Sequence, residues 1–306
     1  MYAAIDVGSN TLRMLVARCA KNGLHAELYR QKITRLGGSY SAEKGLSRES
    51  IERTLFAFTE FADILREMQI ERVRVVGTAA LRHAKNAQHL VNLVKLKTRL
   101  DLEVIGGKEE ARLSSAGVLS VLNPCPETML IFDIGGGSTE LSLFDQKQMI
   151  FSQSYPLGVV QLCEEMPEPE HRVAFIKDMV VKLSADLLHA GISPRLLKEC
   201  ELVGTAGTVT TLAALNLEMA EYDRRLINNH QLDLAWMIPT LRQLHCMTIA
   251  EREQLPGLEV GRGDLIIPGL ELLISLCSYF KKPSIRVADA GLLEGVLLTF
   301  CRHSSD

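Results

Sequence analysis

The feature that most constrains this chain is an internal repeat with a spacing of 127 residues. The stretch around Asp6 resembles the stretch around Asp133, and the tetrapeptide Val-Gly-Thr-Ala of residues 76–79 recurs at residues 203–206. Either match alone would be weak, but two matches at one common spacing indicate the duplication of a whole domain. We therefore expect a chain of two similar halves.

The central copy of the repeat, residues 129–144, reads MLIFDIGGGSTELSLF. An apolar run typical of a buried strand ends at Asp133, and the glycines that follow let the backbone turn tightly with its N–H groups facing an anion. A flexible linker or a plain hairpin turn is the alternative, but linkers are not enclosed by two apolar strands. The stretch predicts a phosphate-binding loop formed by Gly135, Gly136, Gly137 and Ser138.

Two acids border this loop. Asp133 precedes the glycines and Glu140 follows them. Mg²⁺ is usually bound by one or two carboxylates together with phosphate oxygens and water. The spacing therefore predicts that Asp133 and Glu140 hold a magnesium ion against the bound phosphate.

Further loops of small residues extend the pattern. The repeat assigns Gly8, Ser9 and Asn10 to the same type of turn as the central glycines. A strand ending near Val203 leads into another such loop, with Gly204, Gly207 and Thr208 as its candidate phosphate-binding residues. We expect loops from both halves to converge on one cleft suited to a nucleoside triphosphate or a longer phosphate chain.

Basic and acidic residues at helix starts supply further candidates. Arg82 follows the strand of residues 73–76 near the start of a helix, where it is well placed for an anion. Gly106 and Gly107 precede Lys108, but the P-loop pattern is absent because Glu109 follows the lysine. An acid in a first helical turn usually complements the helix dipole, and this is the interpretation we give to Glu109.

Composition and charge exclude several classes of protein. With 47% hydrophobic residues, 23% charged residues and a net charge of −3, the chain is an ordinary globular protein without a general surface for nucleic acid. The seven cysteines are scattered and form no C-x-x-C pair, which predicts free thiols in a reducing cytoplasm. Neither a zinc site nor a signal peptide is indicated, and the apolar region of residues 265–280 is too interrupted to span a membrane.

Seven motifs together resemble the Ppx/GppA family of exopolyphosphatases and guanosine pentaphosphate phosphohydrolases. They follow the family order over essentially the whole chain and read AIDVGSNTLRMLVA, TRLGG, VGTAALR, GGKEEARL, FDIGGGSTEL, VGTAGTVTTLAAL and ADAGLLEG. The resemblance implies a duplicated α/β fold of the actin, sugar-kinase and Hsp70 type. We place one domain at residues 1–120, completed by a C-terminal helix of about 292–306, and the other at residues 121–291.

The resemblance also implies roles for single residues. Glu110 resembles the catalytic base that positions and deprotonates water, and Arg82 resembles a phosphate-contacting arginine. Many members carry an arginine where this chain has Leu293, and longer members continue past its end at Asp306 into a helical region that holds polyphosphate and forms dimers. The chain is expected to be a short form, with a homodimer as one option.

The function that we predict is Mg²⁺-dependent hydrolysis that releases terminal phosphate from polyphosphate or from guanosine pentaphosphate (pppGpp) in the cytoplasm. Two alternatives stay open. A kinase or ATPase of the same fold would need an adenosine pocket and an acceptor site, and a sensor would bind the ligand without hydrolysis. Phosphate release without an acceptor distinguishes the first, and intact catalytic acids argue against the second.

Overall fold

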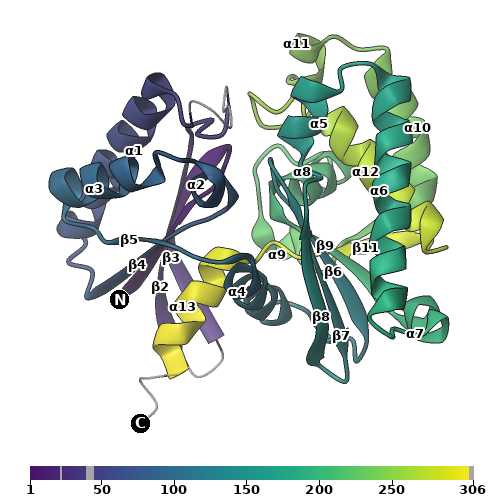
Figure 1. Cartoon of the computed structure of the whole chain (residues 1–306), viewed down its shortest axis with the longest axis horizontal. Helices are drawn as coiled ribbons and strands as arrows, with labels where there is room; N and C mark the ends of the chain where they lie inside the picture. Colours follow the sequence, from purple (N-terminus) through teal and green to yellow (C-terminus); the bar gives the residue numbers. More distant parts are fainter. Residues whose placement is uncertain (21–22, 39–44, 303–306) are drawn as a thin grey trace. The chain divides into compact units, whose positions relative to one another are not determined.

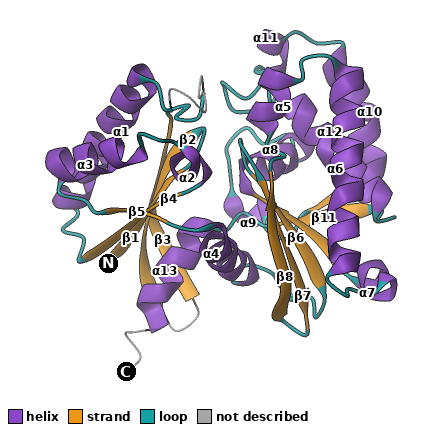
Figure 2. Ribbon diagram, viewed as in Figure 1, coloured by secondary structure: helices purple, strands orange, loops and turns teal. Residues whose placement is uncertain are grey.

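A computed structural model describes residues 1–20, 23–38 and 45–302 of the chain. The chain forms two compact units, which are Met1–Ser120 together with Ala290–Asp306, and Val121–Asp289. We refer to them as unit 1 and unit 2. Each contains a mixed sheet with helices packed against it (Figures 1 and 2). The predicted α/β fold is confirmed.

Unit 1 has a sheet in the order β3-β2-β1-β4-β5. Alternate residues of the strands enter two different cores, one shared with α1 and α3 and the other with α4 and α13. The sheet is thus the middle of three layers (Figure 2). Its elements are β1 (Tyr2–Val7), β2 (Thr11–Ala20), β3 (Gly23–Ile33), α1 (Arg48–Glu67), β4 (Arg72–Gly77), α2 (Ala79–His83), α3 (Ala87–Thr98), β5 (Leu102–Val104), α4 (Gly107–Leu119) and α13 (Leu292–Arg302).

Unit 2 has a sheet in the order β10-β11-β9-β6-β7-β8, and its largest apolar core lies between the sheet and helices α6, α8 and α12. Its elements are β6 (Met129–Ile134), β7 (Thr139–Asp145), β8 (Gln148–Tyr155), α5 (Val159–Glu165), α6 (Pro169–His189), α7 (Pro194–Glu199), β9 (Glu201–Thr205), α8 (Ala206–Asn216), α9 (Arg224–Ile227), β10 (Gln231–Asp233), α10 (Leu234–His245), α11 (Ile249–Arg252), α12 (Ile266–Tyr279) and β11 (Ser284–Val287).

The two sheets repeat one another. The order β3-β2-β1-β4-β5 corresponds to β8-β7-β6-β9-β11, and in each sheet the first hairpin is antiparallel while the next strand is parallel. The predicted duplication is therefore visible in the topology. One difference is that Asp6 lies opposite Val76 whereas Asp133 lies opposite Thr205, so the third strand is shifted by two residues relative to the repeat in the sequence.

Local sequence signals account for many of the boundaries. The side chain of Ser47 accepts a hydrogen bond from the Ser50 N–H at 3.1 Å, which caps α1 where the sequence predicts a helix start. The sequence of residues 222–262 predicts a largely irregular stretch, and this prediction is wrong in part because α10 occupies Leu234–His245. Pro239 inside this helix weakens the helical signal. The sequence Lys21-Asn22-Gly23 predicts a hairpin turn, but residues 21 and 22 lie outside the described residues.

The prediction that all cysteines are free thiols is wrong. Cys19 on β2 and Cys301 on α13 form a disulfide, although 282 residues separate them in the sequence. The reason is tertiary, because α13 packs across the sheet of unit 1 and brings the end of the chain to its first hairpin. Within the described ranges, the other five cysteines form no disulfide.

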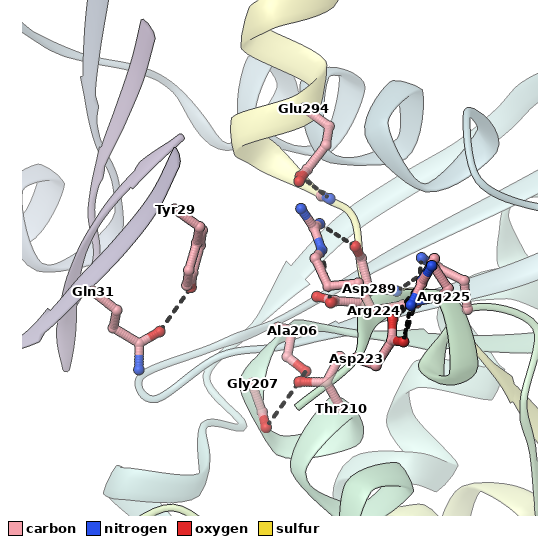
Figure 3. A network of polar contacts seen from close by, with 12 residues as sticks. Tyr29, Gln31, Ala206, Gly207, Thr210, Asp223, Arg224, Arg225, Asp289 and Glu294 are labelled. Carbon is pink, nitrogen blue, oxygen red and sulfur yellow. Dashed lines mark hydrogen bonds and ion pairs between the residues drawn. The ribbon is translucent and has the colours of Figure 1, made fainter. Parts of the chain in front are cut away.

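One turn of unit 2 holds both ends of that unit. The side chain of Asn229 accepts from the Asn123 N–H at 2.9 Å and donates to the Val121 carbonyl at 3.0 Å. At the other end, Arg224 Nε donates to the Asp289 carboxylate at 2.8 Å (Figure 3). Residues 224–229, which are α9 and the two residues after it, therefore hold the segments where the chain enters and leaves unit 2. None of the helices in the described ranges is long and apolar enough to span a lipid bilayer.

Candidate active site

The loop at Gly8, Ser9 and Asn10 connects β1 to β2 in unit 1. The Gly8 N–H donates across the turn to the Thr11 carbonyl at 3.0 Å. The carbonyls of Ser9 and Asn10 accept backbone N–H groups of residues 34–37 at 2.8–2.9 Å. Because the carbonyls are used internally, the loop offers N–H groups, and those of Ser9 and Asn10 donate to no carbonyl of the described residues. This pattern suits an anion.

The central glycine loop repeats the arrangement in unit 2. The carbonyls of Gly135 and Gly136 accept from the first N–H groups of α5 at 2.9–3.3 Å. Gly158 lies so close to the loop that a Cβ there would be 2.2 Å from the Gly136 carbonyl oxygen. Among described residues, no backbone carbonyl accepts from the N–H groups of Gly136, Gly137 and Ser138. The loop thus presents donors, as expected for a phosphate cradle.

The third predicted loop divides into two kinds of residue. Gly204 is buried in β9, where a Cβ would meet the Val209 and Ile285 side chains at 2.9–3.0 Å, and Thr208 packs against Gly269 of α12. These two residues serve packing. Ala206, in contrast, has a left-handed φ of 70°, and such strain in a residue other than glycine is frequent at functional sites. The Thr210 hydroxyl bonds the loop carbonyls at 3.2 and 3.3 Å (Figure 3).

Arg262 is a candidate that the sequence analysis missed. A Cβ on Gly207 would lie 2.3 Å from its guanidinium, so a larger residue at this position would require the arginine side chain to move. Glu259 holds Arg262 with an ion pair of 2.8 Å, and the arginine side chain is only 16% exposed. The Gly-Arg-Gly-Asp stretch of residues 261–264 was the available signal.

Asp133 and Glu140 lie directly opposite each other on β6 and β7, so their side chains share one face of the sheet. Glu140 is buried with 6% exposure, and its Oε1 accepts hydrogen bonds from the Ser138 and Ser154 hydroxyls, each at 2.7 Å. Both serine hydroxyls thus contact the same carboxylate oxygen. Two acids beside a loop of N–H donors fit Mg²⁺ that is completed by water and phosphate oxygens.

A metal cage made by protein alone is not present in the described ranges, since no group of three or more His, Cys, Asp or Glu side chains is placed to hold an ion. A structural zinc site uses four nitrogen or sulfur ligands.

Glu110 and Arg82 come together in unit 1. Glu110 lies in the first turn of α4 with 9% exposure, and Arg82 donates both to its carboxylate and, at 3.2 Å, to the Ile105 carbonyl. Glu109 differs, because Arg112 on the next turn binds it through two hydrogen bonds of 2.8 Å. The hydrogen bonds from Arg112 lower the pKa of Glu109 and tie it to the helix surface. The two neighbouring acids therefore have different partners, Arg82 for Glu110 and Arg112 for Glu109.

Asp6 and Arg13 form a second pair in unit 1 that the sequence analysis did not foresee. They are partners in the β1–β2 hairpin, and Arg13 Nε donates to Asp6 Oδ2 at 3.0 Å. Asp6 is 1% exposed, and its Oδ1 has no hydrogen-bond partner in the described structure. The guanidinium of Arg13, with a side chain 28% exposed, is thus held beside the first phosphate loop.

The end of the ADAGLLEG motif contributes to the apolar core and to the start of α13. Leu293, which replaces the family arginine, is 4% exposed in the core between α4 and α13. Glu294 accepts from the Gly291 N–H at 2.9 Å and so caps the start of its own helix (Figure 3). The loss of the arginine is therefore accommodated by apolar packing.

Curated relatives of this chain carry names of two enzyme activities. Exopolyphosphatase 2 of Mycobacterium tuberculosis is 30% identical over 311 residues, with 97% of each chain covered. Guanosine-5'-triphosphate,3'-diphosphate pyrophosphatase of Aeromonas hydrophila is 29% identical over 311 residues that cover 100% of this chain and 60% of that protein.

Solved structures agree with these relatives. A Ppx/GppA protein of Aquifex aeolicus superposes with a TM-score of 0.80 at 28% identity, covering 100% of this chain and 98% of its own. An exopolyphosphatase from Cytophaga hutchinsonii reaches 0.87 at 25% identity, covering 99% and 98%. The sequence profile of the Ppx/GppA phosphatase family matches residues 15–303. The resemblance drawn from the motifs is confirmed, and the chain belongs to the Ppx/GppA phosphatase family.

Proposed function

We propose that this protein hydrolyses terminal phosphoanhydride bonds with Mg²⁺, releasing phosphate from inorganic polyphosphate or from pppGpp. The observation that carries the proposal is the pair of loops at residues 8–10 and 135–138. Both direct their carbonyls into the protein and keep N–H donors for an anion. Membership in a family with relatives named for these two substrates supports the same conclusion.

Glu110 is the general base of the proposed reaction. Its carboxylate accepts a proton from a water molecule, whose oxygen forms a bond to the terminal phosphorus as the bond to the bridging oxygen breaks. The bridging oxygen leaves with the electron pair on the shortened chain. Burial of Glu110 and its contact with Arg82 fix the position of the carboxylate before the substrate arrives.

Stabilisation of charge is assigned to donors from several elements. In each unit separately, the loop N–H groups and the guanidinium groups, which are Arg13 and Arg82 in unit 1 and Arg262 in unit 2, are candidate donors to phosphate oxygens. Asp133 and Glu140 would hold Mg²⁺, which supplies positive charge to the phosphate oxygens. Substrate binding therefore depends mainly on phosphate recognition, which both polyphosphate and the 5'-triphosphate of pppGpp satisfy.

Phosphate release from polyphosphate, pppGpp and ATP, measured side by side with Mg²⁺ and without an acceptor, tests the proposal. Release from either of the first two substrates, and its loss after removal of the metal with a chelator, is the expected result. Turnover of ATP alone would favour the kinase or ATPase alternative. Binding of pppGpp or polyphosphate without any release would identify a sensor.

A further inference from the structure

Ser154 stands outside every motif that the function uses, yet its hydroxyl contacts a candidate metal ligand. It lies on β8 directly opposite Glu140, as Glu140 lies opposite Asp133 on the other side. The three side chains therefore form a row across one face of the sheet of unit 2. The Ser154 hydroxyl donates to Glu140 Oε1 at 2.7 Å.

We propose that Ser154 is a positioning residue that orients the Glu140 carboxylate for the metal. This inference rests on the proposed role of Glu140 as a metal ligand. Two hydroxyl donors converge on Oε1, which restricts rotation of the carboxylate and so fixes the direction in which it faces. Hydrogen bonds of this kind around a metal ligand commonly set its orientation and basicity.

The two hydroxyls are not equivalent. Ser138 belongs to the glycine loop, and a phosphate bound there competes for its hydroxyl. Ser154 belongs to a strand, and its place opposite Glu140 is set by the β7–β8 register. When Ser138 turns to the substrate, Ser154 is the donor that keeps Glu140 in place.

Unit 1 supports the link between this serine and the acid. In the corresponding row, Arg13 replaces Glu140 and lies between Asp6 and Gln31. At this position of unit 1 there is no carboxylate opposite the third strand to accept a hydroxyl hydrogen bond, because the facing residue is the guanidinium-bearing Arg13. The serine accompanies the acid in the unit that has two acids, and it is missing from the unit that has one.

The test compares Ser154→Ala with Ser152→Ala. Ser152 lies two residues earlier on the same face of β8, opposite Ser142, so it is a matched control that loses an equal hydroxyl. Mn²⁺ serves as the probe, and its binding is measured by the electron paramagnetic resonance of free Mn²⁺ with a methylene-bridged triphosphate present. No turnover is needed for this measurement.

We expect Ser154→Ala to weaken Mn²⁺ binding by about tenfold, the lower end of the range for such hydrogen-bond partners. Ser152→Ala should bind Mn²⁺ as the wild type does, and Ser154→Thr, which keeps the hydroxyl, should restore binding. With the natural substrate, Ser154→Ala should need more Mg²⁺ for half-maximal rate, whereas kcat at saturating Mg²⁺ stays within about twofold.

Equal Mn²⁺ binding by Ser154→Ala and Ser152→Ala would overturn the inference. A fall in kcat of Ser154→Ala that saturating Mg²⁺ does not restore would also overturn it, because the hydroxyl would then act on the substrate. Failure of the proposed function gives a different pattern. In that case the wild type releases no phosphate, while Ser154→Ala still binds Mn²⁺ more weakly than Ser152→Ala. Both serine changes should leave the unfolding midpoint unaltered.

Discussion

The two units place different charges at the same point of a repeated hairpin. In unit 1, Asp6 is paired with Arg13, and in unit 2, at a spacing of 127 residues for both positions, Asp133 is paired with Glu140. Unit 1 thus neutralises its buried acid with its own cation. Unit 2 instead sets two acids opposite each other, the pair to which we assign the metal in the proposed function.

This difference shows how two copies of a duplicated domain can carry different charged residues at equivalent positions. A loop with N–H groups that donate to no described carbonyl is present in both units. In the part of the chain that the structure describes, the two facing acids at this hairpin belong to unit 2 and the Arg82–Glu110 pair belongs to unit 1. We therefore expect changes in unit 1 to affect the chemical step and changes at the acids of unit 2 to affect the use of metal.

The largest effect should come from Glu110→Gln, which removes the base of unit 1 but keeps its size. Turnover should fall by about 10²- to 10⁴-fold, the usual contribution of a positioned general base, with little change in substrate affinity. Steady-state kinetics and binding of a non-hydrolysed phosphate chain measure the two quantities. If kcat of Glu110→Gln is close to that of the wild type, Glu110 is not the general base and another group activates the water.

The disulfide of unit 1 should give the next largest effect, on stability. Replacing both Cys19 and Cys301 by serine should lower the free energy of unfolding by about 2–4 kcal/mol, the typical contribution of a native disulfide. Chemical denaturation without reductant measures the difference. Addition of dithiothreitol should bring the wild type to the level of the double variant.

Cys246→Ser is the control for this comparison, because Cys246 is exposed and forms no disulfide. It should unfold like the wild type with and without reductant.

Alkylation should leave Cys277 unmodified in the native protein, since burial raises the pKa of its thiol to about 12. For the disulfide, equal free energies of unfolding of the wild type and of the variant with serine at positions 19 and 301 would show that the bond does not stabilise unit 1.

Exchange of the acids at equivalent positions tests the comparison directly. Asp133→Asn should raise the Mg²⁺ concentration for half-maximal activity by more than about tenfold, because it removes one of two candidate ligands. Asp6→Asn, which changes the corresponding residue of unit 1, should leave that concentration nearly unaltered. If the two variants shift the Mg²⁺ dependence equally, the division between the units is wrong.

The smallest effect is expected for Glu109→Gln, next to the proposed base. Loss of a partly exposed ion pair and of a favourable interaction with the helix dipole should cost at most about 1 kcal/mol of stability and little activity. Since hydrogen bonds from Arg112 lower the pKa of Glu109 in the folded state, the wild type should lose its advantage as the pH falls through that pKa. Chemical denaturation at neutral and acidic pH measures this, and a large loss of turnover would contradict the assignment within the pair.

Much of the fold could be predicted because its signals are local. Apolar runs such as residues 129–132 mark strands, glycines mark the loops that follow them, and Ser47 marks a helix start. The helix at Leu234–His245 was missed because a proline inside it contradicts its periodicity. Local rules fail where tertiary packing outweighs them.

The candidate site was predictable only in part for a related reason. The sequence by itself determined the duplication, the donor loops and the acids at 133 and 140, because each depends on residues within one short stretch or on an exact spacing. The acid at 110 was chosen over its neighbour at 109 only through the resemblance to the family. The tertiary structure decided which partners meet. Arg262 rests on Gly207, Ser154 bonds to Glu140, and Cys19 joins Cys301. Such contacts depend on strand register and on helix packing between segments distant in the chain. Neither can be predicted from the spacing of residues along the sequence.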